Sequence, residues 1–368
     1  MFMFRAGSIV IMLVLAAAFF SGKAMAQERE NQGKTEVATS MNVEMICTVL
    51  NLTDSWDERH TEFRMAVKAR EIFLPFKDHA AVSATKVFMK KGWWHLYYCY
   101  LALYLSDFPE AALLVDPSDP RIGRLLSVKL AGYVSALRDF YSDAKYYKYW
   151  IRERKAYEKL RKKIEKKVRG IDIAGILERF YGTSMDHYVI MPVTQLPDMS
   201  LHVERDSDRQ RYAFCLFGPQ SGDKGFDYDK KDLTADFIFH EFSYSFLEPL
   251  VRKHDSLLMN HSYIYEKVKD AMAEKGHLSW GRVFSENLIR AIRTRLAGKA
   301  FGQKVTPEVL HEEIEAGYEL VPVFDGILDL YEQDRARYTT FDDFMPELFT
   351  QLGRRITPDW KSENGGGE

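Results

Sequence analysis

The chain has 368 residues and a formal net charge of -2, which excludes the basic excess of most nucleic-acid-binding proteins. Its cysteines, Cys47, Cys99 and Cys215, include no Cys-x-x-Cys pair, which excludes a disulfide scaffold and a cysteine-rich metal site. We expect buried free thiols in a globular protein.

The first residues have the pattern of a secretory signal peptide. Arg5 supplies a positive charge, the run "IVIMLVLAAAFF" an apolar segment, and Ala24-Met25-Ala26 a small-residue cleavage pattern. We therefore predict a signal peptide over 1–26 and a flexible polar leader over 27–40. The protein is expected to be exported to the periplasm or the extracellular medium, with no transmembrane segment in the mature chain. An uncleaved N-terminal anchor is the alternative.

Helical periodicity dominates the next part of the chain, so we predict an N-terminal helical region over 41–170. Pro75 ends or kinks its helix in "DERHTEFRMAVKAREIFLPF". The run "WWHLYYCYLALYL" at 93–105 is too short to span a bilayer and predicts a fully buried helix, with His95 as a core histidine. The stretch 135–170 predicts one long helix that ends at Gly170; glutamates interrupt its basic residues, which favours a solvated face over a nucleic-acid contact.

The pattern changes near residue 171. The runs "HYVIMPVTQL", "MSLHVERD" and "RYAFCLFG" are rich in β-branched and aromatic residues, which predicts strands of a small antiparallel sheet. Helices follow, without strand–helix alternation, so the predicted fold is α+β and predominantly α-helical rather than doubly wound. We assign 171–360 to this α+β region and 361–368 to a disordered tail.

The segment "DLTADFIFHEFSYSFLEPL" predicts a helix with Asp232 or Thr234 as N-cap and Pro249 near its end. It contains His240 and Glu241, the first two residues of an H-E-x-x-H motif. In that motif two histidines one turn apart bind zinc, and the glutamate acts as general base on the metal-bound water. Tyr244 occupies the place of the second histidine.

A candidate third ligand follows on the next predicted helix, "WGRVFSENLIRAIRTRL". Two roles are open for Glu286 on this helix: it ligates a metal, or it pairs with Arg290 at i+4 on a solvated face. Four histidines offer further donors, but none has diagnostic spacing, and surface or loop positions are favoured for all of them: His187, His202, His254 and His261.

The stretches "HEFSYSF" and "FSENLIRA", together with "PFKDHAAV" at 75–82 and "TFDDFMPEL" at 340–348, resemble the bacterial, largely exported domain-of-unknown-function family 4932. Its members carry an HEF-x-H-S-F helix followed by an E-x-x-x-R-A helix. The family in turn resembles Glu-type (gluzincin-like) zinc metallopeptidases. The resemblance implies a sheet packed on a metallopeptidase-like helix pair, with His240 and Glu286 as zinc ligands and Glu241 as the catalytic base.

Tyr244 departs from the family pattern. A phenol has a pKa near 10, so zinc would have to displace a proton that a neutral imidazole does not carry. Three functions therefore stay open: an impaired or non-catalytic metallopeptidase-like protein that keeps a peptide-binding cleft, an active zinc peptidase that uses Tyr244 or another histidine, and a structural or binding protein without metal. The expected ligand in the first two is a peptide or protein; no nucleic-acid partner is expected.

Overall fold

The computed structural model describes residues 34–53, 63–115, 130–207, 209–222, 225–228, 234–302 and 305–357. The predicted signal peptide, the first half of the leader, the N-cap candidate Asp232 and the tail lie outside these residues. Within them, the fold is α+β and predominantly helical, as predicted. No helix among the described residues is long and apolar enough to cross a membrane.

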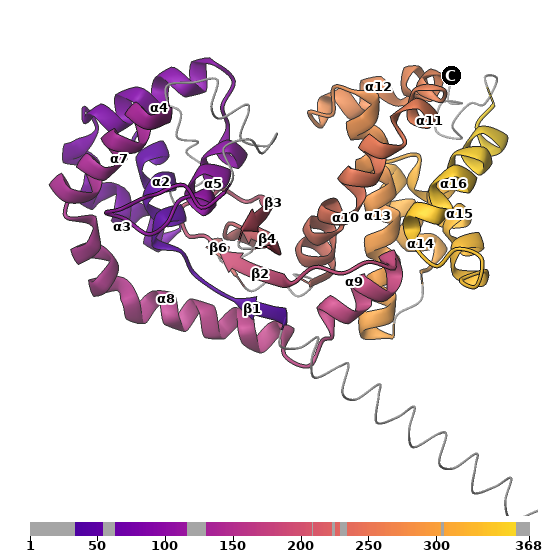
Figure 1. Cartoon of the computed structure of the whole chain (residues 1–368), viewed down its shortest axis with the longest axis horizontal. Coiled ribbons are helices and arrows are strands. Elements are labelled where there is room, and N and C mark those ends of the chain that lie inside the picture. The colour runs from indigo at the N-terminus through magenta and orange to yellow at the C-terminus, as the bar shows by residue number, and fades with distance from the viewer. Residues whose placement is uncertain are drawn as a thin grey trace, which may run out of the picture.

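Most helices that come before the three longer strands, drawn from indigo to magenta in Figure 1, gather on one side of the sheet, except that the second half of the last of them packs into the core on the other side. They are α2 (Met41–Asn51), α3 (Arg64–Phe73) with the 3-10 turn η2 (Leu74–Phe76), α4 (Ala80–Lys90), α5 (His95–Tyr104), α7 (Leu130–Asp143) and α8 (Tyr146–Val168). The predicted helix over 135–170 is therefore two helices. Lys145, between α7 and α8, adopts a left-handed conformation with φ 49°, which breaks the helical ladder.

The central sheet has the strand order β1-β2-β4-β3. Its strands are β1 (Thr35–Val37), β2 (His187–Pro192), β3 (Ser200–Ser207) and β4 (Gln210–Phe217), with a separate hairpin of β5 (Gln220–Gly222) and β6 (Gly225–Asp227). The predicted strands are confirmed, but two predictions were wrong. The sheet is mixed, because β1, β2 and β4 are parallel and only β3 is antiparallel. The end of the predicted flexible leader is β1, which pairs with β2.

Both faces of this sheet are buried. Along β2, Tyr188 and Ile190 belong to a core shared with the C-terminal helices, whereas Val189 and Met191 belong to a core shared with the N-terminal helices. This alternation follows the two-residue period of a strand. Burial on both faces explains why β2 and the second half of β4 are continuous apolar runs.

The C-terminal helices cover the other face of the sheet (Figure 1). They are α9 (Ile173–Tyr181), the π-helical turn η3 (Thr234–Phe239), α10 (His240–Lys253), α11 (Asp255–Met259), the 3-10 turn η4 (Ser262–Ile264), α12 (Tyr265–Glu274), α13 (Trp280–Phe301), α14 (Pro307–Glu315), α15 (Val321–Gln333) and α16 (Phe341–Arg355). Helix α10 packs against β3, β4 and α13. The predicted helix pair is therefore adjacent, and it lies against the sheet.

Candidate functional site

Helix α10 is fixed to the core by aromatic side chains spaced one turn apart. Phe242 meets Tyr188 of β2 edge to face at 5.3 Å between ring centroids, and Phe246 stacks on Tyr181 of α9 at 4.5 Å. The helix begins directly after the π-helical turn η3, a feature that is frequent at functional sites. Pro249 lies inside the helix and does not end it.

The opposite side chains of α10 meet α13 in a buried group that we call the His240 cluster: His240, Tyr244, Glu286 and Arg290. The Tyr244 hydroxyl donates a hydrogen bond to Glu286 Oε2, and His240 Nε2 lies 3.6 Å from the same oxygen. Arg290 Nε donates to Glu286 Oε1 at 2.8 Å. The first three side chains, predicted as metal ligands, thus come together, and Glu286 also makes its predicted i+4 pair with Arg290. Glu286 is only 5% exposed, so the expectation of a solvated face for this pair was wrong.

The protonation of this cluster follows from its contacts. Burial opposes ionisation of Glu286, but His240, Arg290 and the Tyr244 hydroxyl outweigh it and hold the pKa of Glu286 well below its usual range. Burial, reinforced by the negative charge of Glu286, raises the pKa of Tyr244 well above its usual value. Tyr244 is therefore a neutral phenol that donates to a carboxylate.

These residues do not fit a zinc ion. A catalytic zinc takes three protein ligands, and here the Tyr244 proton and Arg290 each occupy one oxygen of the carboxylate that would have to ligate. A metal-bound histidine almost always donates its second ring N–H to a supporting acceptor, yet buried His240 Nδ1 has no hydrogen-bond partner among the described residues. The described residues also contain no group of three or more His, Cys, Asp or Glu side chains arranged to hold a metal.

A second group, the His202 cluster, consists of Ser200, His202, Glu241 and Glu248 and joins β3 to α10. Ser200 Oγ donates to Glu241 Oε1 at 2.5 Å, and His202 Nδ1 lies 3.5 Å from Glu241 Oε2. His202 Nε2 lies 3.5 Å from Glu248 Oε1. Burial disfavours the charged ring, but these carboxylates outweigh it and raise the pKa of His202 to about 9. Glu241, the predicted base, is thus bound by a hydroxyl and an imidazolium.

The two clusters touch through aromatic rings. The His202 ring stacks on the Tyr244 ring with centroids 4.4 Å apart and an interplanar angle of 10°. The Arg282 guanidinium, from the first turn of α13, lies 5.4 Å from the centroid of the same Tyr244 ring. Tyr244 therefore forms the centre of the combined site.

A cavity of about 710 Å³ opens beside the His202 cluster; we call it the cleft. Its walls come from α5, β3, α10 and the start of α13, and they include Trp94, Leu96, Tyr97, Tyr100, His202, Glu248, Arg252, Ser279, Arg282 and Ser285. The prediction that α5 is fully buried was wrong: His95, Leu96, Tyr97 and Tyr100 are only partly buried. This aromatic face of α5 forms a wall of the cleft.

Sequence reasoning missed His202, Glu248 and Arg282 as members of the site. His202 was expected at the surface or in a loop, but it is buried on β3. Its strand position between the inward-facing Leu201 and Val203 was the one available signal, because alternate residues face opposite sides of a sheet. The other candidate histidines have partners elsewhere: His187 with Gln210, His254 with Asp342, and His261 with the Leu257 carbonyl. All three cysteines are free and buried, as predicted.

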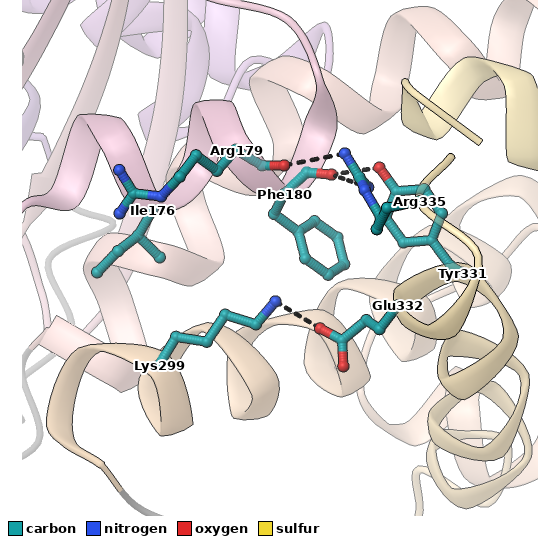
Figure 2. Close-up of a pocket in the computed structure, with 7 residues that line it drawn as sticks. All are labelled: Ile176, Arg179, Phe180, Lys299, Tyr331, Glu332 and Arg335. Carbon is teal, nitrogen blue, oxygen red and sulfur yellow. Dashed lines mark hydrogen bonds and ion pairs between the residues drawn. The ribbon is translucent and has the colours of Figure 1, made fainter. Parts of the chain in front are cut away.

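Another cavity, of about 380 Å³, lies between α9, α13 and the end of α15. Figure 2 shows that two of its cations, Lys299 and Arg335, bind groups of the protein itself. Lys299 pairs with Glu332 at 2.6 Å. Arg335 donates to the carbonyls of Phe180 at 2.9 Å and Arg179 at 3.0 Å, in the last turn of α9. Arg335 therefore caps the C-terminal end of α9, where four carbonyls lack helical partners.

We expect Arg335→Met to lower the free energy of unfolding by about 2 kcal/mol, because it removes charge-assisted hydrogen bonds to these carbonyls while keeping most of the apolar contact. Urea unfolding followed by circular dichroism measures the change. The matched control is Arg337→Met, since Arg337 is exposed and its guanidinium contacts only the Tyr338 ring among the interactions described. An equal loss in both variants would contradict the capping role.

Comparison with known proteins gives a family and no function. The family model described as "Domain of unknown function (DUF4932)" matches residues 68–351, which include the sheet strands β2 to β4 and the helices α10 and α13. No curated protein matches the chain. No solved structure matches it either.

Proposed function

Since this chain belongs to the DUF4932 family, whose model spans the whole site, we propose that it binds extended peptides in the cleft and that its metallopeptidase-like helix pair has lost the zinc centre. The observation that carries the proposal is the Tyr244 hydroxyl bound to Glu286. A hydrogen bond between the second and third ligand positions replaces the metal that would otherwise join them. We further propose, from the signal-peptide pattern, that the protein acts outside the cytoplasm.

The arrangement of His240 and Glu286 supports descent from a metal-binding site. Side chains on α10 and α13 converge at the spacing that the H-E-x-x-H and downstream glutamate pattern requires. Glu241, next to His240, faces the edge strand rather than solvent, since it contacts Ser200 and His202. Of the neighbouring polar side chains, His202 and Glu248 line the cleft itself.

The edge strand supports peptide binding. β3 is the outermost strand of the sheet, and the Tyr104 hydroxyl donates to the Glu204 carbonyl at 2.8 Å, so that carbonyl faces away from β4. In an antiparallel strand the N–H and C=O of one residue face the same side, and this side alternates along the strand. The backbone groups of Ser200 and His202 therefore also face away from β4. Since Tyr104 of α5 occupies the carbonyl of Glu204, we propose that an extended peptide pairs with the part of this edge at Ser200 and His202.

Recruitment of His202 as a replacement zinc ligand is the main competing function. The contacts of its ring weigh against it, because its two nitrogens face the carboxylates of Glu241 and Glu248, each at 3.5 Å. Its ring also lies flat on Tyr244 instead of directing a nitrogen towards Glu286. We therefore propose binding rather than hydrolysis.

We expect the protein without its first 26 residues to bind fluorescein-labelled β-casein, an unfolded protein, and to leave it uncleaved with or without added zinc. Tyr97→Ala should weaken the binding about tenfold, which corresponds to about 1.4 kcal/mol, because aromatic side chains dominate many binding surfaces. Fluorescence anisotropy measures the affinity, and gel electrophoresis detects fragments.

The matched control is Tyr147→Ala, since Tyr147 is 39% exposed on α8 and does not line the cleft. It should bind like the wild type. Zinc-dependent fragments that disappear in Glu241→Gln would contradict the proposal and establish a peptidase. Equal binding by the wild type and Tyr97→Ala would mean that the peptide binds at a surface other than the cleft.

A further inference from the structure

The cleft carries more positive than negative fixed charge. Arg252 and Arg282 line it together with a single carboxylate, Glu248. Each guanidinium lies 3.5 Å from a different oxygen of Glu248. Strong charge-assisted hydrogen bonds are shorter, at about 2.7–2.9 Å. Glu248 is therefore shared loosely, and donor capacity remains for a second carboxylate.

The first turn of α13 offers further donors on the same side of the cleft. The helix runs from Trp280 to Phe301, and a backbone hydrogen bond joins the Val283 N–H to the Ser279 carbonyl at 3.0 Å. The Ser279 hydroxyl accepts from the Arg282 N–H, while the N–H groups of Trp280 and Gly281 have no acceptor within the helix. Such a turn favours a negative charge.

Ser285 adds a hydroxyl to the same wall of the cleft, independently of the arginines and the helix dipole. Ser285, one turn further along α13, lines the cleft and is only 5% exposed. Among the described residues no hydrogen bond to this hydroxyl is observed, and the hydroxyl is not one of the fully buried polar atoms that lack a partner. It is therefore accessible from the cleft and can donate a hydrogen bond to a ligand oxygen.

From these donors we infer that the cleft recognises a carboxylate of its peptide, with Arg282 and Ser285 as specificity-determining residues and the first turn of α13 as the supporting dipole. The carboxylate is the C-terminus of the peptide or an acidic side chain. Trp94, which precedes α5, and Tyr97 and Tyr100 on α5 then contact the neighbouring peptide residues across the cleft. This inference rests on the proposed peptide-binding function.

Three labelled probes test it: an extended peptide of Thr, Val and Ser with a free carboxyl terminus, the same peptide with a C-terminal carboxamide, and the carboxamide with one internal Glu. We expect the free acid to bind the wild type about tenfold more tightly than the carboxamide, as for one charge-assisted contact. In Arg282→Gln the two should bind alike, at the affinity of the carboxamide. Ser285→Ala should reduce the preference in part, and Arg282→Lys should restore some of it.

The outcomes separate the inference from the function on which it rests. If all probes bind the wild type equally, carboxylate recognition is wrong and peptide binding stands. If the internal Glu restores tight binding to the carboxamide, recognition is supported with an acidic side chain as its source. If no probe binds, both are wrong. Arg161→Gln, which removes an arginine on α8 that is ion-paired with Glu158, is the matched control and should keep the wild-type preference.

Discussion

We expect the variant Tyr244→His to bind zinc stoichiometrically, whereas the wild-type chain, purified and dialysed alongside it, carries none. The substitution places a second imidazole one helical turn from His240 and facing Glu286. It also removes the hydroxyl that donates to the Glu286 carboxylate. If the binding free energy of a structural zinc divides evenly among four ligands, the added ligand contributes about 3 kcal/mol, or on the order of a hundredfold in affinity.

Atomic absorption of the dialysed proteins and competition with a chromogenic chelator measure content and affinity. Tyr244→Phe is the matched control, because it also removes the hydroxyl but offers no ligand. The double variant His240→Ala with Tyr244→His should lose the metal again. Stoichiometric zinc in the wild type that disappears in His240→Ala would show that the altered motif still builds a metal site, and the proposed loss of zinc would be wrong.

Local sequence patterns predicted the strands β2 to β4 and several helices, among them α5, α10 and α13, but not how the strands pair. Alternating and apolar runs placed β2, β3 and β4 because strand formation is visible within a few residues. The parallel pairing was hidden because it joins distant segments. Thr35 pairs with Tyr188 across the entire N-terminal helical region, and β4 pairs with β2 only after the chain has passed through β3. Such crossovers leave no local signature.

The candidate site was predictable to the extent that it lies on two amphipathic helices. His240, Tyr244 and Glu286 converge because helical spacing fixes which side chains share a face. His202 was missed because its burial depends on carboxylates contributed by α10, far along the chain. Likewise, α5 has the composition of a core helix. Its aromatic face is partly exposed because the start of α13 lies across a cleft from it, and the local sequence does not reveal that arrangement.

The His240 cluster should also contribute strongly to stability. We expect Glu286→Gln to lower the free energy of unfolding by about 3 kcal/mol, because it removes one partner of a buried ion pair. The loss lies at the lower end of the range for such changes, since Arg290 keeps its bond to Glu313 Oε2 at 2.9 Å. Glutamine retains the shape of the side chain, so the measured loss reports charge rather than a cavity. Urea unfolding at neutral pH measures it.

The pH dependence of the unfolding free energy shows whether the loss in Glu286→Gln comes from the missing charge or from a packing defect. The pKa of Glu286 is held well below that of an unfolded-chain glutamate, about 4.3, so its stabilisation is fully present above that value and is lost as the pH falls towards the folded pKa. The difference between wild type and Glu286→Gln should therefore be constant near neutral pH and shrink in acid. Glu158→Gln, which breaks an exposed pair with Arg161 on α8, is the control and should change stability little. A difference that stays constant into acid would mean that Glu286 acts through packing, and the account of Tyr244 as a donor to a buried carboxylate would fail with it.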